Sequence, residues 1–199
     1  MARSFIEAVK NRRSIYALGR RDAVTQGEVE KAVHESILHV PSAFNSQSAR
    51  IVVLWGKQSD SFWKAVGDVL KKIVPPESFG QTEAKLQSFA AGLGTILFFE
   101  DQEVVESLMT SYPLYQDNFP VWSLQSSGML QFAVWTMLED LGLGASLQHY
   151  NPLVDDFVRK EWNVPASWKL LAQMPFGSVE APAGEKTFTP LEGRVLTFK

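Results

Sequence analysis

The sequence contains no cysteine. Without thiols the chain has no disulfide cross-links, no thiolate ligands for a metal and no cysteine nucleophile. Packing of side chains must therefore hold the fold together, and the composition is compatible with a reducing compartment.

Histidine is scarce too, and the signatures of several enzyme classes are missing. His34, His39 and His149 are scattered and no His-Glu-x-x-His pattern occurs, so no metal site is predicted. No Gly-x-Ser-x-Gly elbow is present, which argues against a serine hydrolase. The glycine pairs within 92–94 and 142–144 lack the third glycine of a dinucleotide fingerprint and the lysine of a P-loop, so we interpret them as turns.

Long apolar runs are also missing. The most apolar stretch, 128–138, is too short to span a bilayer and contains Gln131. Residues 1–7 show no apolar run before Glu7, unlike a secretory signal. We therefore expect a soluble, cytoplasmic protein without a membrane partner.

No charge of one sign dominates: 19 Lys and Arg stand against 22 Asp and Glu, a formal net charge of −3. This balance argues against general nucleic-acid binding, which needs a broad basic surface. Before Asp22, however, several basic residues accompany the single acid Glu7, and such a cluster suggests a site for one small anion. The basic residues are Arg3, Lys10, Arg12, Arg13, Arg20 and Arg21.

Length and hydrophobic patterning predict one domain over residues 1–199, of class α/β or α+β. Segment 121–141 is apolar on most faces and predicts a long helix at the centre of the domain. Other helices are predicted from Ser4 to about Asn11, from Thr25 to Val40, through 62–73, 84–90 and 101–109, and from Asn151 to before Pro165. Strands are predicted at 51–55, 95–99, 145–148, 170–176 and 195–198.

Two short polar segments are candidate binding elements. Arg12, Arg13 and Ser14, at the end of a short helix, can grip a phosphate through charge-assisted hydrogen bonds. The alternative is a solvated arginine pair at a helix C-terminus, which spacing alone favours. Loop 42–48 supplies donors and acceptors suited to the edge of a planar heterocycle, or it is an ordinary polar turn.

The ordered pair of motifs, Arg-Arg-Ser-Ile-Tyr at 12–16 and Pro-Ser-Ala-Phe-Asn-Ser-Gln-Ser at 41–48, resembles the opening of the flavin-dependent nitroreductase family. Segments 92–101 and 144–152 resemble one branch, which contains yeast fatty-acid-repression-mutant-type proteins and bacterial copper-induced nitroreductases. The resemblance runs from Phe5 to Val195.

The resemblance implies a nitroreductase-like fold, with a central mixed sheet surrounded by helices, a long buried central helix and a terminal segment swapped between subunits. It also implies a homodimer with two FMN sites in the interface. Such proteins use NADH or NADPH to reduce nitroaromatics, quinones or related small-molecule acceptors in a ping-pong cycle. The chemistry is centred on the flavin, so no catalytic side chain is predicted.

The resemblance further assigns cofactor contacts to this chain. Arg12, Arg13 and Ser14 would hold the FMN phosphate and ribityl end, and Lys186 would join them. Tyr16, at the end of the same motif, is a further expected cofactor contact. The contacts expected from the second subunit are Ser42, Asn45 and Gln47, and those expected against the ring near its reactive face are Leu147, Gln148 and His149.

The chain departs from the family pattern near its C-terminus. Many relatives carry Lys-x-Arg before a Pro-Leu-Glu segment, whereas Phe188 stands at the second basic position here. Arg194 is the expected substitute.

Aromatic residues could line a pocket for flat substrates, although core packing explains them equally well. We hypothesise that segment 113–119 covers the flavin. The aromatic residues are Phe79, Phe89, Tyr112, Tyr115, Phe119 and Trp122.

Two other function classes are considered. The first is a flavin-binding regulatory or stress-response protein with slow turnover, which the branch names suggest. The second, a nucleic-acid adaptor using the basic cluster at 12–21, is disfavoured by the net charge.

Overall fold

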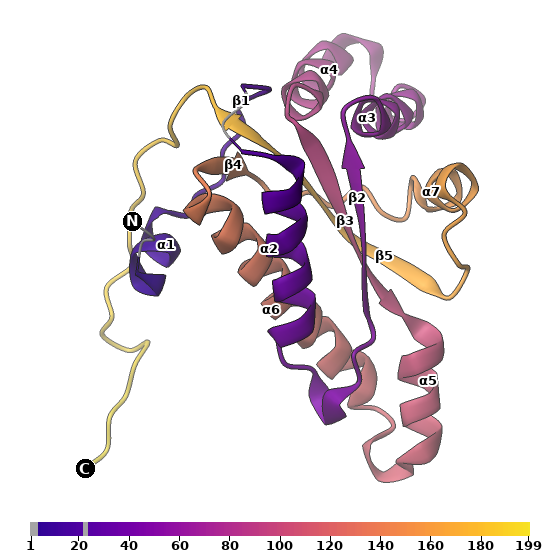
Figure 1. The fold of residues 1–199 in the computed structure, drawn as a ribbon, viewed down its shortest axis with the longest axis vertical. Coiled ribbons are helices and arrows are strands. Elements are labelled where there is room, and N and C mark those ends of the chain that lie inside the picture. The colour runs from indigo at the N-terminus through magenta and orange to yellow at the C-terminus, as the bar shows by residue number, and fades with distance from the viewer. Residues whose placement is uncertain (1–3, 22–23) are drawn as a thin grey trace.

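The computed structural model describes residues 4–21 and 24–199, and Arg3 of the N-terminal basic cluster lies outside these ranges. The described chain folds around a five-stranded sheet with helices on both faces (Figure 1). The strand order is β1-β5-β3-β2, and β4 also pairs with β5. The strands are β1 (Leu18–Gly19), β2 (Ala49–Trp55), β3 (Gly94–Asp101), β4 (Leu143–Ala145) and β5 (Trp168–Val179).

Strand β3 forms the middle of the sheet because it is apolar on both faces. It pairs antiparallel with β2 and with β5, and all its residues are buried. Ile96 and Phe98 contribute to the core on one face, while Leu97 and Phe99 contribute to the core on the other, as the two-residue period of a strand requires. The four ladders between described strands are antiparallel, and a parallel bridge joins Ser14 to Ala145.

The helices divide between the two faces. Helices α2 and α6 contribute to the core that contains Ile96 and Phe98, and α3, α4 and α7 contribute to the core that contains Leu97 and Phe99. The helices are α1 (Phe5–Asn11), α2 (Gln26–His39), α3 (Lys57–Leu70), α4 (Pro76–Ala90), α5 (Gln102–Ser111), α6 (Phe119–Asp140) and α7 (Asp155–Trp162), with short 3-10 turns η1 (Ala43–Asn45) and η2 (Pro113–Tyr115).

Local capping signals set several helix ends as predicted. Ser4 and Thr25 accept hydrogen bonds from the backbone N–H groups of Glu7 and Glu28, and both capping boxes are complete. Asp101 likewise accepts from the N–H of Glu103 at the start of α5. Because these bonds are local, the sequence pattern was sufficient to find them.

The long helix α6 is confirmed, and its two sides differ. Leu130, Val134 and Leu138 are at most 3% exposed against the sheet. On the opposite side several apolar residues keep between 39% and 54% of their surface exposed in the single chain: Val121, Leu124, Met129 and Phe132. The described chain therefore leaves one apolar side of α6 exposed.

Two predicted element boundaries are wrong because tertiary contacts override the local pattern. Asn151 does not cap a helix: its side-chain oxygen accepts from Gln173 Nε2, and α7 begins only at Asp155. The strand expected at 145–148 ends at Ala145, and Gln148 forms only an isolated bridge to Gln173.

No strand forms at 195–198. Within the described residues this segment has no ladder partner, and its apolar side chains stay exposed, with Phe198 at 90%. A strand requires a neighbour to satisfy its backbone, and among residues 4–21 and 24–199 none pairs with this segment. Figure 1 shows the tail leaving β5 and running away from the body of the molecule. Among the described helices, none combines the length and apolarity needed to cross a bilayer.

Candidate active site

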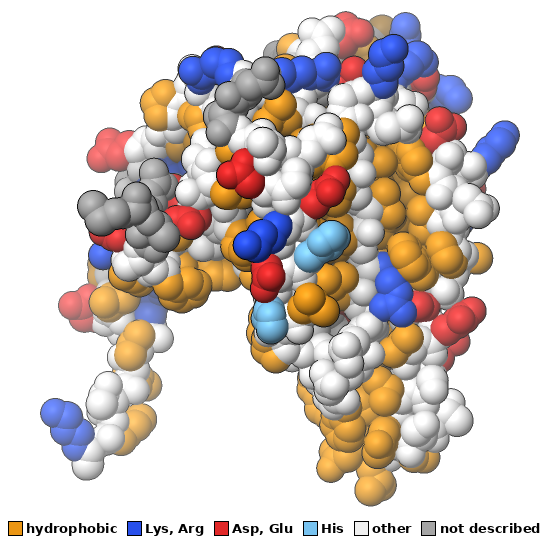
Figure 2. Space-filling model, in the orientation of Figure 1, with side chains coloured by type: hydrophobic (Ala, Val, Ile, Leu, Met, Phe, Trp, Pro, Cys, Tyr) orange, Lys and Arg blue, Asp and Glu red, His pale blue; other side chains and the backbone are white. Residues whose placement is uncertain are grey.

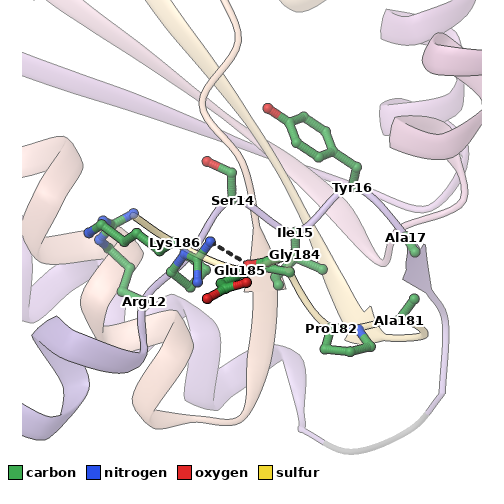
Figure 3. Close-up of a pocket in the computed structure, with 12 residues that line it drawn as sticks. Arg12, Ser14, Ile15, Tyr16, Ala17, Ala181, Pro182, Gly184, Glu185 and Lys186 are labelled. Atoms are coloured by element: carbon green, nitrogen blue, oxygen red, sulfur yellow. Dashed lines mark hydrogen bonds between the residues drawn. The ribbon is translucent and has the colours of Figure 1, made fainter. Parts of the chain in front are cut away.

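The Arg12 motif lines a cavity of about 610 Å³, here called the basic pocket. Two segments far apart in sequence form it, 12–17 after α1 and 181–186 after β5 (Figure 3). Arg13 Nη2 donates to the carbonyl oxygen of Gly184 at 2.8 Å, the dashed line in Figure 3. Five predicted cofactor residues line this pocket: Arg12, Arg13, Ser14, Tyr16 and Lys186.

The sheet edge holds the first segment in place. The N–H of Ile15 donates to the carbonyl of Ala145 at 2.9 Å, beside the Ser14 to Ala145 bridge. A Cβ on Gly144 would lie only 2.8 Å from the Ile15 side chain, so the close approach requires glycine there. Backbone pairing thus fixes where the arginine motif lies.

Arg12 is partly desolvated. Its guanidinium carbon lies 4.3 Å from the Trp135 ring centroid and 6.0 Å from that of Phe132. Its Nε is buried and has no hydrogen-bond partner in the described part of the chain. Burial and, after it, the charge of Arg13 lower the pKa of Arg12. Two neighbouring cations, one with an unused buried donor, form a site that an anion would stabilise.

Two other arginines of the N-terminal cluster, Arg20 and Arg21, lie in structural contacts. Arg20 donates to the carbonyls of Ala90 and Gly92 and pairs with Asp60. Arg21 pairs with Glu180 at 2.9 Å. The cluster is therefore divided, and the Arg12–Arg13 pair is the part that faces the basic pocket.

The C-terminal residues divide in the same way. Lys186 lines the basic pocket, with Nζ 5.1 Å from the centroid of the Phe188 ring. Arg194 does not line it; in the exposed tail, its Nη1 donates to the Thr189 carbonyl at 3.1 Å. The expected replacement of the missing basic residue by Arg194 stays a prediction.

Ser42, Asn45 and Gln47 line a different cavity of about 280 Å³, here called the loop hollow. The loop hollow lies at the C-terminal end of α2 near η1, whereas the basic pocket lies near α1 and β4 (Figure 1). The single chain therefore does not bring these residues into the basic pocket.

Loop 42–48 has an unusual backbone. Phe44, Asn45 and Gln47 have φ values of 55°, 50° and 48°, in the left-handed region. Such conformations cost about 1–3 kcal/mol each for residues with a Cβ and concentrate at functional sites. Ser42 Oγ accepts from the N–H of Gln47 at 3.0 Å and helps to close the loop.

Phe44 is the centre of an aromatic cluster. Its ring centroid lies 5.9 Å from Trp122 in a stacked arrangement, and 4.9, 5.8 and 5.2 Å from Tyr112, Tyr115 and Phe119. Beside Phe44, a cavity of about 420 Å³ opens onto Trp122, Gln125 and Met129, and we call it the aromatic hollow. Figure 2 shows apolar side chains gathered at the lower end of the molecule, where α5 and the start of α6 lie in Figure 1.

The sequence could not separate these aromatics from core residues. Phe89 is fully buried beside Trp63 at 4.9 Å, and Phe79 lies on α4, which covers the other face of the sheet. Neither belongs to the cluster around Phe44.

Leu147, Gln148 and His149 follow Ala145, the residue bridged to Ser14, but they line neither the basic pocket nor the loop hollow. The backbone of Gln148 exchanges two hydrogen bonds with Gln173, and its Nε2 donates to Ser146 at 3.0 Å. Its buried side chain therefore has a structural role in the single chain, while His149 is exposed.

Comparison with known proteins establishes the family. The model of the Nitroreductase family matches residues 9–178. The chain belongs to this family.

The branch expected from the sequence is also confirmed. The putative nitroreductase HBN1 and nitroreductase FRM2 of Saccharomyces cerevisiae are each 33% identical to this chain, with 93% of each chain covered. Nitroreductase CinD from Lactococcus lactis, solved with chloramphenicol, is 50% identical with a TM-score of 0.91 over 98% of this chain and all of that one. CinD solved with 4-nitrophenol is 51% identical with a TM-score of 0.90 over the same shares of the two chains. These relatives make this protein an oxidoreductase of the nitroreductase type.

Two features of this nitroreductase escaped the sequence analysis. Trp135 lies under Arg12, but in sequence it was one apolar residue in an apolar helix. Glu100 lines the loop hollow, and an acid directly after the apolar run 95–99 was a signal that could have identified it. In the described residues, no group of His, Asp and Glu side chains is placed to hold a metal ion.

Proposed function

We propose that this nitroreductase is an FMN-dependent enzyme that passes hydride from NADH or NADPH to nitroaromatic, quinone or related acceptors in a ping-pong cycle. The observation that carries the proposal is the basic pocket, where Arg12, Arg13 and Lys186 line one cavity and Arg12 Nε has no partner in the described chain.

The residues of the basic pocket fit the phosphate end of a mononucleotide. Guanidinium groups bind phosphate oxygens in a forked geometry, and each charge-assisted hydrogen bond contributes about 1.5–3 kcal/mol. The hydroxyl of Ser14 adds a donor on the same wall. A cavity of about 610 Å³ is in the range of cofactor sites.

The site also requires a second copy of the chain. Ser42, Asn45 and Gln47 line a separate hollow, so in our proposal they meet the flavin bound in the partner's basic pocket. The exposed apolar side of α6 and the exposed C-terminal tail supply surface for such a homodimer. Swapping of the tail would give 195–198 the neighbour that it lacks in the single chain.

When bound, FMN supplies hydride transfer between the nicotinamide and the acceptor. In our proposal the chain's own residues bind and orient: Leu147, Gln148 and His149 lie beside the ring, and the aromatic hollow receives a flat acceptor between Phe44 and Trp122. We assign no general acid, because solvent can deliver protons to an open site.

We take residues 1–199 as one domain in this proposal, because both cores are built on the same sheet and the family match spans most of the chain. The cysteine-free composition is compatible with a reducing cytoplasm, which is the proposed location.

The test begins with the purified protein. It should be yellow, with the absorption spectrum of oxidised flavin, and should oxidise NADH or NADPH faster with a nitroaromatic acceptor than without one. A colourless protein that does not bind added FMN would overturn the proposal. Flavin binding with negligible acceptor-dependent turnover would instead favour the regulatory alternative.

A further inference from the structure

Glu100, the acid near the end of β3, is buried, and within the described residues its side chain bonds to two hydroxyls and forms no ion pair. It is 1% exposed. Its Oε2 accepts from Ser48 Oγ at 2.5 Å and from Ser123 Oγ at 2.8 Å, while Oε1 has no hydrogen-bond partner in the described residues. Burial of a carboxyl group is unfavourable, so packing alone does not explain an acid after the apolar run 95–99.

The two hydroxyls come from different elements. Ser48 ends loop 42–48, whereas Ser123 lies in the first turns of α6. Glu100 therefore joins the loop to α6 from inside the sheet. Ser48 is 1% exposed, so its hydroxyl is also removed from water; it donates to Glu100 Oε2, and Ser46 Oγ lies 3.4 Å away as a second, longer partner.

Residues of β3 and β2 also bind the backbone carbonyls of loop 42–48. The N–H of Asp101 donates to the Ser48 carbonyl at 2.9 Å. Arg50 Nη1 donates to the Gln47 carbonyl at 2.8 Å, and Arg50 Nη2 pairs with Asp101 at 3.0 Å. These contacts converge on the last two residues of the loop.

The loop requires such contacts because its backbone is strained. Phe44, Asn45 and Gln47 are all left-handed, and such residues persist only where the surroundings over-determine them. Within the loop, Ser42 accepts from the N–H groups of Asn45 and Gln47, and Ala43 accepts from the N–H of Ser46. Two longer contacts of 3.4 Å join Gln47 Nε2 to the Asn45 carbonyl and Ser46 Oγ to Ser48 Oγ.

We propose that Glu100 is a positioning residue, which holds loop 42–48 through Ser48 in the conformation that presents Asn45 and Gln47. The role of those two side chains toward the flavin rests on the proposed function. Glu100 itself acts through Ser48 and is not a catalytic residue.

The two serines provide a matched test, because each donates one hydroxyl hydrogen bond to the same oxygen of Glu100. Ser48→Ala cuts the link to the loop, and Ser123→Ala cuts the link to α6. Hydrogen–deuterium exchange of the Asn45 and Gln47 amides in flavin-free protein reports opening of the loop. We expect exchange to accelerate about tenfold in Ser48→Ala and to change less than twofold in Ser123→Ala.

Glu100 is tested with two variants of similar shape. Glu100→Gln keeps an oxygen that accepts from both serines, so exchange at Asn45 and Gln47 should stay close to that of the wild type. Glu100→Leu removes the acceptor and should open the loop as Ser48→Ala does. Equal exchange in Ser48→Ala and Ser123→Ala, or an unchanged loop in a folded Glu100→Leu protein, would overturn the positioning role.

The consequence for the cofactor is measured separately by titrating FMN into each variant. Ser48→Ala should weaken FMN binding about tenfold, and Ser123→Ala should retain it within twofold. If the wild type binds no FMN, the proposed function fails while the exchange result still decides the role of Glu100. If the wild type binds FMN but the two serine variants bind it equally, the positioning role fails and the proposed function stands.

Discussion

The guanidinium carbon of Arg12 lies 4.3 Å from the ring centroid of Trp135, which joins the residue after α1 to the middle of α6. The contact orients a cation toward the basic pocket by means of a side chain that does not line the pocket itself. An aromatic side chain of α6 thus supports Arg12, the residue that is the candidate for binding the phosphate.

Trp135→Leu should weaken FMN binding by a factor of about 2 to 30, because a cation over an aromatic face gains roughly 0.5–2 kcal/mol. Trp135→Phe keeps an aromatic face and should lose less. The dissociation constant, measured from quenching of flavin fluorescence, checks both. An equal loss of FMN affinity in the two variants would show that the size of the side chain at position 135, and not its aromatic face, holds Arg12.

Arg12→Ala should weaken FMN binding about 10- to 100-fold, because it removes charge-assisted hydrogen bonds to the phosphate. Lys64→Ala removes an exposed positive charge on α3, where an ion pair with Asp68 contributes little, and serves as the control. The measurement is the same flavin titration. Retention of FMN by Arg12→Ala at the level of Lys64→Ala would argue against the phosphate assignment.

Phe44→Ala should raise the KM for a nitroaromatic acceptor roughly tenfold, since the ring contacts four aromatic neighbours and borders the aromatic hollow. Ile73→Ala is the control, because Ile73 is also an exposed apolar residue, at 58%, but lies just after α3 and does not line that hollow. Steady-state kinetics with varied acceptor give the comparison. An unchanged KM in Phe44→Ala would exclude the hollow as the acceptor site.

Leu124→Glu should convert a dimer into monomers, because it places a charge on the exposed apolar side of α6. Light scattering during gel filtration should give about twice 22.3 kDa for the wild type and about 22.3 kDa for the variant. Ile73→Glu changes a residue of similar exposure just after α3 and should leave the dimer intact. A wild type that elutes as a monomer would contradict the proposal that two subunits together form each flavin site.

Replacing Glu100 should change how stability depends on pH. Burial raises the pKa of Glu100 above its usual 4.5, while the hydroxyls of Ser48 and Ser123 and the charge of Arg50 oppose the shift and Asp101 adds to it. The folded protein then keeps a proton that the unfolded chain has lost. Glu100 therefore contributes stability that is present below its ordinary pKa and is lost as pH rises through the folded pKa.

Glu100→Gln cannot titrate, so the free energy of unfolding of the wild type minus that of Glu100→Gln should fall as pH rises from about 4 toward 8. Urea unfolding at several pH values measures this difference. A difference that is flat or increases with pH would contradict the raised pKa.

The sequence by itself determined the features that depend on neighbours along the chain. The Ser4–Glu7 and Thr25–Glu28 boxes start α1 and α2 because a cap and its partner are three residues apart. The continuous apolar run within 94–101 made a buried strand, and the ordered motifs at 12–16 and 41–48 were sufficient to indicate the family.

Only the tertiary structure decided what depends on partners distant in sequence. In the folded chain, the Trp135 ring lies beneath the Arg12 guanidinium, and Phe89 packs in the core, away from the aromatic residues around Phe44. The Asn151 side chain accepts a hydrogen bond from Gln173 and does not cap a helix. Segment 195–198 has strand-forming residues but pairs with no strand in the part of the chain that the structure describes, so it forms no strand there. Local capping energies act over three or four residues, whereas burial, ring contacts and ladder pairing arise only after the chain has brought remote segments together.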